Sequence, residues 1–158
     1  MRQRRSNKIS FSGIIFGVLL ILNGVCFVTR SWAGDVLIIG HQDIPGSNIT
    51  QKEIKSIFLG EQVKWKNGGD IRFVLFLSRI HDSFLKEYIG ITSTQYRNYW
   101  KKKVFTGQAR SPKSFKSKEK LLDYIAETKG AVGYIPSDGS PDDSIGGSNS
   151  RIKIITVK

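Results

Sequence analysis

Cysteine is almost absent from this sequence of 158 residues. The single cysteine, Cys26, lies inside an apolar run, so the chain can form no internal disulfide and the part that follows offers no thiolate for catalysis or metal binding. Histidine is also scarce, with only His41 and His81. Both are expected in polar loops, where a histidine is more often solvated than a metal ligand, and only Asp43 stands near His41 as a second ligand. We therefore expect no metal site and no cofactor.

Motifs of the common enzyme classes are missing as well. The sequence has no serine–histidine–aspartate order, no nucleophile elbow, no Walker phosphate loop and no paired-acid motif. Serines and aspartates are present, but no spacing makes one residue a base and another a nucleophile. The protein is not expected to be an enzyme.

Acidic residues are absent from the first 33 positions, which contain five basic ones. Between the basic residues an apolar run extends from about Phe11 to Val28, and Ser31-Trp32-Ala33 has the small-x-small pattern of a cleavage site. This composition predicts a secretory signal peptide over residues 1–33. The alternative is an uncleaved anchor, because the run at residues 11–28 is nearly long enough to span the bilayer core of about 30 Å. Both interpretations place residues 34–158 in the periplasm, outside the inner membrane.

The part after the leader keeps a positive charge. Without the five basic residues of the leader, 20 basic residues face 13 acidic ones, and the net charge falls from +12 to +7. This excess favours an anionic partner, and export makes nucleic acid an unlikely one. The densest basic region spans residues 101–120, with Trp100, Phe105 and Phe115 interleaved. It could contact a membrane or an anionic polymer, or it could be the solvated face of helices with a buried aromatic side.

Residues 34–158 are enough for one domain. The continuous apolar run Asp35–Ile39 predicts a strand buried on both faces, of the kind found in parallel sheets. Thr50 and Glu53 form a capping box for a helix over residues 51–59, and Gly60 is placed to end it. The apolar run at residues 71–77 predicts a second buried strand.

Three more helices and two strands are predicted after that strand. A short helix runs through Tyr88 with Ser78 or Asp82 as its N-cap, a second lies between Thr92 and Gly107, and a third lies between residues 117 and 130. The second of these helices has an apolar stripe of Tyr96, Tyr99, Trp100 and Val104. Strands at residues 131–135 and 151–157 complete an α/β order. The polar loop between them, residues 137–150, is expected to be a mobile connection without a site.

Several segments occur in an order that resembles one protein family. They are Ile57-Phe58-Leu59-Gly60 with Trp65, the turn at Ser78, Tyr99-Trp100, Val104-Phe105-Thr106-Gly107 and residues 130–136. In this order they are similar to the second lobe of the phosphate-binding proteins of ABC uptake systems and their short relatives. The resemblance covers about Asp35 to Pro136. It implies a single three-layer lobe of the type 2 periplasmic-binding-protein fold, with a central mixed, mostly parallel sheet flanked by helices.

The resemblance also implies a site. In the family, a Ser-Gly-Thr turn followed by a phenylalanine binds phosphate with hydroxyl and backbone N–H groups at a helix N-terminus. Here Ser78, Arg79 and Ile80 stand at the three turn positions, and Phe84 matches the phenylalanine. Arg79, in place of the glycine, is either a bidentate phosphate ligand or a solvated charge. The candidate ligand-binding residues are Ser78, Arg79, His81, Asp82 and Ser83.

The sequence therefore predicts an exported, non-catalytic protein that binds phosphate or another oxyanion and is associated with ABC-type phosphate transport. Its partners would be the small anion and an ABC permease or another inner-membrane protein. The alternative is a membrane-anchored interaction or sensory module of the cell envelope, with the same fold, that has lost ligand binding.

Overall fold

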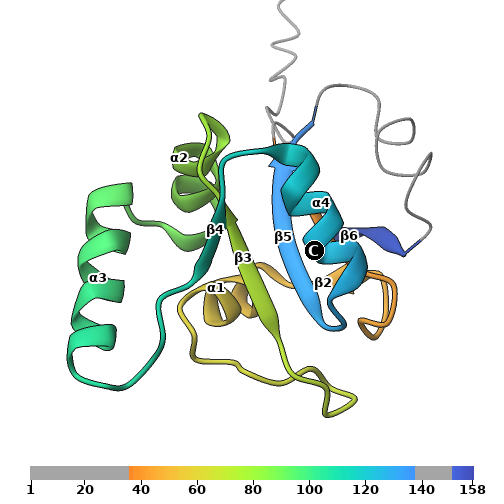
Figure 1. Cartoon of the computed structure of the whole chain (residues 1–158), viewed down its shortest axis with the longest axis horizontal. Helices are drawn as coiled ribbons and strands as arrows, with labels where there is room; N and C mark the ends of the chain where they lie inside the picture. The colour runs from red at the N-terminus through yellow and green to blue at the C-terminus, as the bar shows by residue number, and fades with distance from the viewer. Residues whose placement is uncertain (1–35, 138–150) are drawn as a thin grey trace, which may run out of the picture. The chain divides into compact units, whose positions relative to one another are not determined.

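The computed structural model describes residues 36–137 and 151–158. The predicted leader, and all but the first residue of the loop predicted at residues 137–150, lie outside the described residues. In the described ranges, no helix is long and apolar enough to cross a membrane. These residues form an α/β fold built on one six-stranded sheet (Figure 1).

The elements follow one another in nearly the predicted order. They are β1 (Val36–His41), β2 (Asn48–Ile49), α1 (Gln51–Phe58), β3 (Arg72–Phe76), α2 (Ile80–Phe84), the π-helical turn η2 (Leu85–Ile89), α3 (Ser93–Phe105), β4 (Lys113–Phe115), α4 (Lys118–Glu127), β5 (Ala131–Pro136) and β6 (Ile152–Val157). The sequence does not predict β2 and β4, because strands of two or three residues are too short to show an apolar pattern.

The strand order of the sheet is β2-β6-β1-β5-β3-β4. Three of the five pairings, β2–β6, β3–β4 and β3–β5, are parallel, so the sheet is mixed and mostly parallel, as predicted. The interpretation of β1 as a strand of the parallel kind is wrong, because β1 is antiparallel to both β5 and β6. Its burial on both faces reflects the helices that cover the sheet, and those helices do not fix strand direction.

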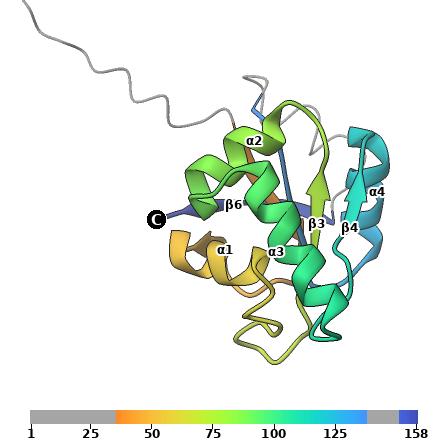
Figure 2. The ribbon, with the colours of Figure 1, turned by 90° about the vertical axis from the view of Figure 1, so that its left-hand side faces the viewer.

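Helices cover both faces of the sheet. Figure 2 shows α4 on one side of the sheet and α1 and α2 on the other. The side chains of Ile54, Ile57 and Phe58 on α1 are buried, as are those of Leu121 and Ile125 on α4. This arrangement confirms the predicted three layers.

Aromatic rings join α1 and α2 to the sheet. Phe84 stacks on Tyr134 of β5, with ring centroids 3.8 Å apart and planes 6° apart, and the Phe58 ring meets Phe84 edge-on at 4.7 Å. All three side chains are fully buried. Phe84, which follows the predicted ligand-binding turn, is thus a core residue in this fold.

Side chains of α3 hold the C-terminal end of α1. The Tyr96 hydroxyl donates to the Phe58 carbonyl oxygen at 2.7 Å. The Tyr99 hydroxyl and the Lys103 ammonium both donate to the Leu59 carbonyl oxygen, at 2.9 and 2.8 Å. A helix end leaves such carbonyls without intrahelical partners, so these bonds dock α3 where α1 stops.

Gly60 makes close packing at this helix end feasible. Its φ of 66° is left-handed, and a Cβ atom on it would lie 2.7 Å from Cη2 of Trp100. The apolar stripe predicted on α3 is only partly buried: Tyr96 and Trp100 face the core, whereas Val104 is 41% exposed. The segment from Ile57 to Gly60 therefore serves helix packing.

Gly130, which precedes β5, allows a matched test of backbone constraint. Its φ is +72°, and an added Cβ would lie 2.1 Å from the Asp70 carbonyl oxygen, whereas Gly107, with φ +71°, has nothing within 4 Å of that position. We expect Gly107→Ala to cost about 1 kcal/mol from strain alone, and Gly130→Ala to cost about 3 kcal/mol or more because the backbone must also move. Urea unfolding of both variants measures the difference, and equal costs would contradict the steric argument.

Candidate functional site

A hollow of about 510 Å³ opens where β3 ends and α2 begins. Ser78, Arg79 and Ser83 line it from the turn and from α2, and Pro136 and Ser137 line it from the end of β5. Because β3 and β5 are parallel, their carboxyl ends meet at this edge of the sheet. The carboxyl ends of parallel strands are the usual ligand-binding edge of an open α/β sheet.

The structure brings three of the five predicted site residues together in this hollow. Arg79 and Ser83 are four residues apart and share one side of the helical segment, and Ser78 precedes them. His81 and Asp82 point to other sides, because successive residues of a helix are rotated by about 100°. His81 lines a separate groove beside α3, and the Asp82 carboxylate accepts a hydrogen bond from the Ser93 hydroxyl.

No side chain in the described part of the protein caps the start of α2. The residue at the N-cap is Arg79, with φ −54° and ψ −31°, so the prediction that Ser78 or Asp82 caps this helix is wrong. Ser78 instead closes the preceding turn: its N–H donates to the Phe76 carbonyl oxygen at 2.9 Å, and its carbonyl accepts from the His81 N–H at 3.0 Å. The Ile80 N–H stands in the first helical turn, where amides have no intrahelical partner.

The charge of the hollow is positive. Arg79 is exposed and is the one charged residue that lines the hollow within the described ranges. No acidic side chain of the described chain lines it. A guanidinium beside two serine hydroxyls and an uncapped helix start suits an oxyanion.

His81 is half-buried, which corrects the prediction of a solvated loop histidine. Its Nδ1 atom lies 2.5 Å from the Tyr134 hydroxyl, and the two rings stack with centroids 6.2 Å apart. Burial lowers the pKa of His81, and the charge of nearby Asp82 opposes that shift only in part. Among the described residues, no group of three or more His, Cys, Asp or Glu side chains could hold a metal ion.

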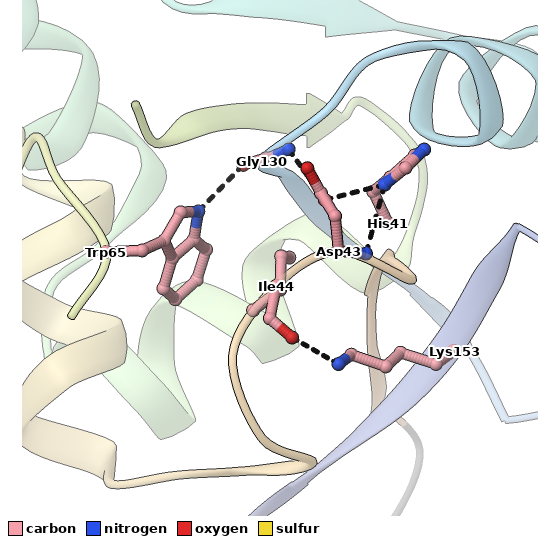
Figure 3. Close-up of polar contacts among 6 residues, drawn as sticks. All are labelled: His41, Asp43, Ile44, Trp65, Gly130 and Lys153. Carbon is pink, nitrogen blue, oxygen red and sulfur yellow. Dashed lines mark hydrogen bonds and ion pairs between the residues drawn. The ribbon is translucent and has the colours of Figure 1, made fainter. Parts of the chain in front are cut away.

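His41 corrects the same prediction in another way. It is only 5% exposed, because β1 extends through it and pairs with Ile152 of β6. Its Nδ1 atom lies 2.6 Å from the Asp43 carboxylate, and that carboxylate accepts the Gly130 N–H at 3.1 Å (Figure 3). Partial burial alone would raise the pKa of Asp43, but the Gly130 N–H and His41 outweigh it and hold the pKa below its usual value.

The cluster around His41 is structural. The Trp65 indole N–H donates to the Gly130 carbonyl oxygen at 3.1 Å, and the Lys153 ammonium donates to the Ile44 carbonyl oxygen (Figure 3). Through backbone groups, these bonds stabilise the loop after β1, the loop after α1 and the turn before β5. The spacing of His41 and Asp43 is visible in the sequence, but no local pattern indicates that Gly130 is their third partner.

Solved structures share this fold. The chain matches PstS of Borrelia burgdorferi with a TM-score of 0.54 and 20% identity, over 78% of this chain and 47% of that one. It matches an ABC-type phosphate transport receptor of Vibrio cholerae with a TM-score of 0.55 and 19% identity, over 78% of this chain and 46% of the receptor. It also matches a phosphate ABC transporter substrate-binding protein of Clostridium perfringens with bound phosphate. That match has a TM-score of 0.51 and 16% identity, over 76% of this chain and 53% of the other.

The chain has the fold of one lobe of a phosphate-binding protein. It spans about half the length of the phosphate-binding proteins that it matches. No sequence-family model matches it, and no curated protein sequence matches it. The predicted fold is confirmed. Its neighbours among phosphate-binding proteins are non-catalytic, and at these identities the likeness is one of fold.

The buried position of His81 predicts how stability depends on pH. Because folding lowers its pKa from the usual 6.5, the unfolded chain binds this proton more readily, and stability is lost as pH falls below about 6.5. We expect His81→Asn to remove much of the loss between about pH 7 and pH 5. Urea unfolding across this range measures it. Glu53→Gln is the control, because the lowered pKa of that carboxyl affects only more acidic solutions and its partners are Thr50 and Lys66. Identical slopes in both variants would contradict the assignment.

Proposed function

We propose that this chain is an exported oxyanion-binding protein associated with ABC-type phosphate uptake, and that phosphate binds in the hollow at the start of α2. Ser78, Arg79 and Ser83 contact the anion. His81 and Asp82 position the turn from behind, through Tyr134 and Ser93 respectively. The protein acts by reversible binding and not by catalysis.

The observation that carries this proposal is the composition of the hollow. Two hydroxyls and a guanidinium converge at the carboxyl ends of β3 and β5, and no acidic side chain among the described residues lines the same space. An arginine fork can donate two parallel N–H groups to one phosphate. Arg79 would thus supply by its side chain what the family's glycine supplies by close backbone approach.

The fold and the charge support the proposal in different ways. The neighbours are phosphate-binding proteins, and the structure from Clostridium perfringens contains phosphate. The net charge of +7 after residue 33 favours an anion, and the leader-like N-terminal composition favours a place in the periplasm beside an inner-membrane permease. A single lobe leaves the anion open to water, so we expect weak affinity.

Calorimetric titration of the exported protein with phosphate tests the site. We expect a dissociation constant on the order of 1 mM, and Arg79→Ala should weaken it about 10-fold or more by removing a charge-assisted contact. Ser78→Ala should weaken it less. Arg97→Ala is the charge-matched control, because Arg97 is an exposed arginine on α3 outside the hollow, and binding should be unchanged.

Two results would overturn the proposal. One is the absence of heat at millimolar phosphate with a sample that unfolds cooperatively in urea. The other is equal weakening by the substitutions at Arg79 and Arg97, because it would show that phosphate senses only the net charge of the protein.

A further inference from the structure

A second and larger hollow lies on another side of the fold. This groove of about 1000 Å³ runs between α3 and the strands β3 and β4, which stand on either side of it in Figure 1. Leu75, Leu77, Trp100, Val104 and Phe105 give it an apolar lining. Its size is at the upper end of pockets that hold drug-sized ligands, about 300–1000 Å³.

Exposed apolar side chains are concentrated in this groove. Leu77 is 40% exposed, Val104 41% and Phe105 94%, and all three line the groove. Among the described residues, Val63 is the one other large hydrophobic side chain that is exposed. A contiguous apolar surface on a small protein usually marks a binding site.

One wall of the groove is the edge of the sheet. Among the described residues, β4 is the last strand in the order and pairs only with β3. The Leu77 N–H donates to the Phe115 carbonyl oxygen at 2.8 Å, so the backbone groups of Phe115 face β3. Because these groups alternate along a strand, those of Ser114 face away from β3, on the free edge. Ser114 also lines the groove.

The rim of the groove is basic. Arg97, Lys101 and Lys102 of α3 line it, and no acidic residue of the described chain does so. A second copy of this chain, with the same basic surface and a net charge of +7 after residue 33, would be repelled. The charge therefore favours an acidic occupant.

We propose that the groove binds an extended segment of a partner protein, with acidic and apolar residues, by strand addition to β4. The segment pairs its backbone with the N–H and carbonyl groups of Ser114. Its apolar side chains enter the groove against Leu77 and Phe105, and its acidic side chains meet Arg97 and Lys101. A free strand edge beside an apolar groove is a recurring way to bind extended peptides. This protein–protein interaction is separate from oxyanion binding.

Phage display of random dodecapeptides on the exported protein tests the proposal. We expect enriched peptides in which acidic and apolar residues alternate, and we expect their synthetic forms to bind by fluorescence anisotropy. Leu77→Glu and the double change of Lys101 and Lys102 to Glu should each weaken binding about 10-fold or more. Val63→Glu, which adds the same charge to an exposed apolar site outside the groove, should leave it unchanged.

Ser114→Pro isolates strand addition. Proline removes an N–H that faces the free edge, where a strand tolerates its loss, so we expect a folded protein with affinity reduced about 10-fold or more. Ser114→Ala keeps the N–H and should bind like the parent. Should Ser114→Pro unfold, peptides N-methylated at alternate positions give the same comparison: one methylation register should abolish binding and the other should not.

Three outcomes would overturn the proposal. The first is that no peptide is enriched, and the second is that enriched peptides bind the groove variants as well as the parent. The third concerns lipid: binding to phosphatidylglycerol vesicles that Phe105→Ala abolishes and Ser114→Pro leaves intact would assign the surface to a membrane.

Discussion

The peptide groups around Gly130 hold the centre of this fold in place. The Asp43 carboxylate accepts the Gly130 N–H, and the Gly130 carbonyl accepts the Trp65 indole N–H at 3.1 Å and the Arg72 N–H at 3.1 Å. One glycine thereby connects the loop after β1, the loop after α1, and the starts of β3 and β5. Since β5 lies between β1 and β3, its position determines where its last residue, Pro136, lies. The hollow at the carboxyl edge depends on that end point, so an anchor at one end of the strands positions the candidate site at the other.

Local sequence signals predicted the helices well. The capping box of Thr50 with Glu53 is present in the structure, because it involves residues within one helical turn. α3 likewise begins directly after Thr92, at the predicted place. The placement of Ser78, Arg79 and Ser83 together likewise follows from local helical spacing. What the sequence could not predict depends on partners far away in the chain: the direction of β1, the short strands β2 and β4, and the burial of His41. An apolar pattern also predicts which residues tend to be buried, but it does not predict that Val104 remains exposed.

Two surfaces meet where β3 ends. Leu77 lines the apolar groove and Ser78 lines the hollow at the start of α2, because consecutive residues of an extended chain point to opposite sides. Each surface has its own arginine, Arg97 on α3 and Arg79 at the start of α2. The proposed anion site and the proposed peptide site thus lie on different surfaces of one lobe, and substitutions can test them separately.

The central position of β1 has a kinetic consequence. Ile38 pairs with Tyr134 on one side and with Ile155 on the other, so the middle of the sheet forms only when segments about a hundred residues apart come together. Contacts of such long range slow folding, because the entropy of closing long loops is lost before the contacts stabilise the chain. The first strand of the domain cannot complete its pairing until the last one is available.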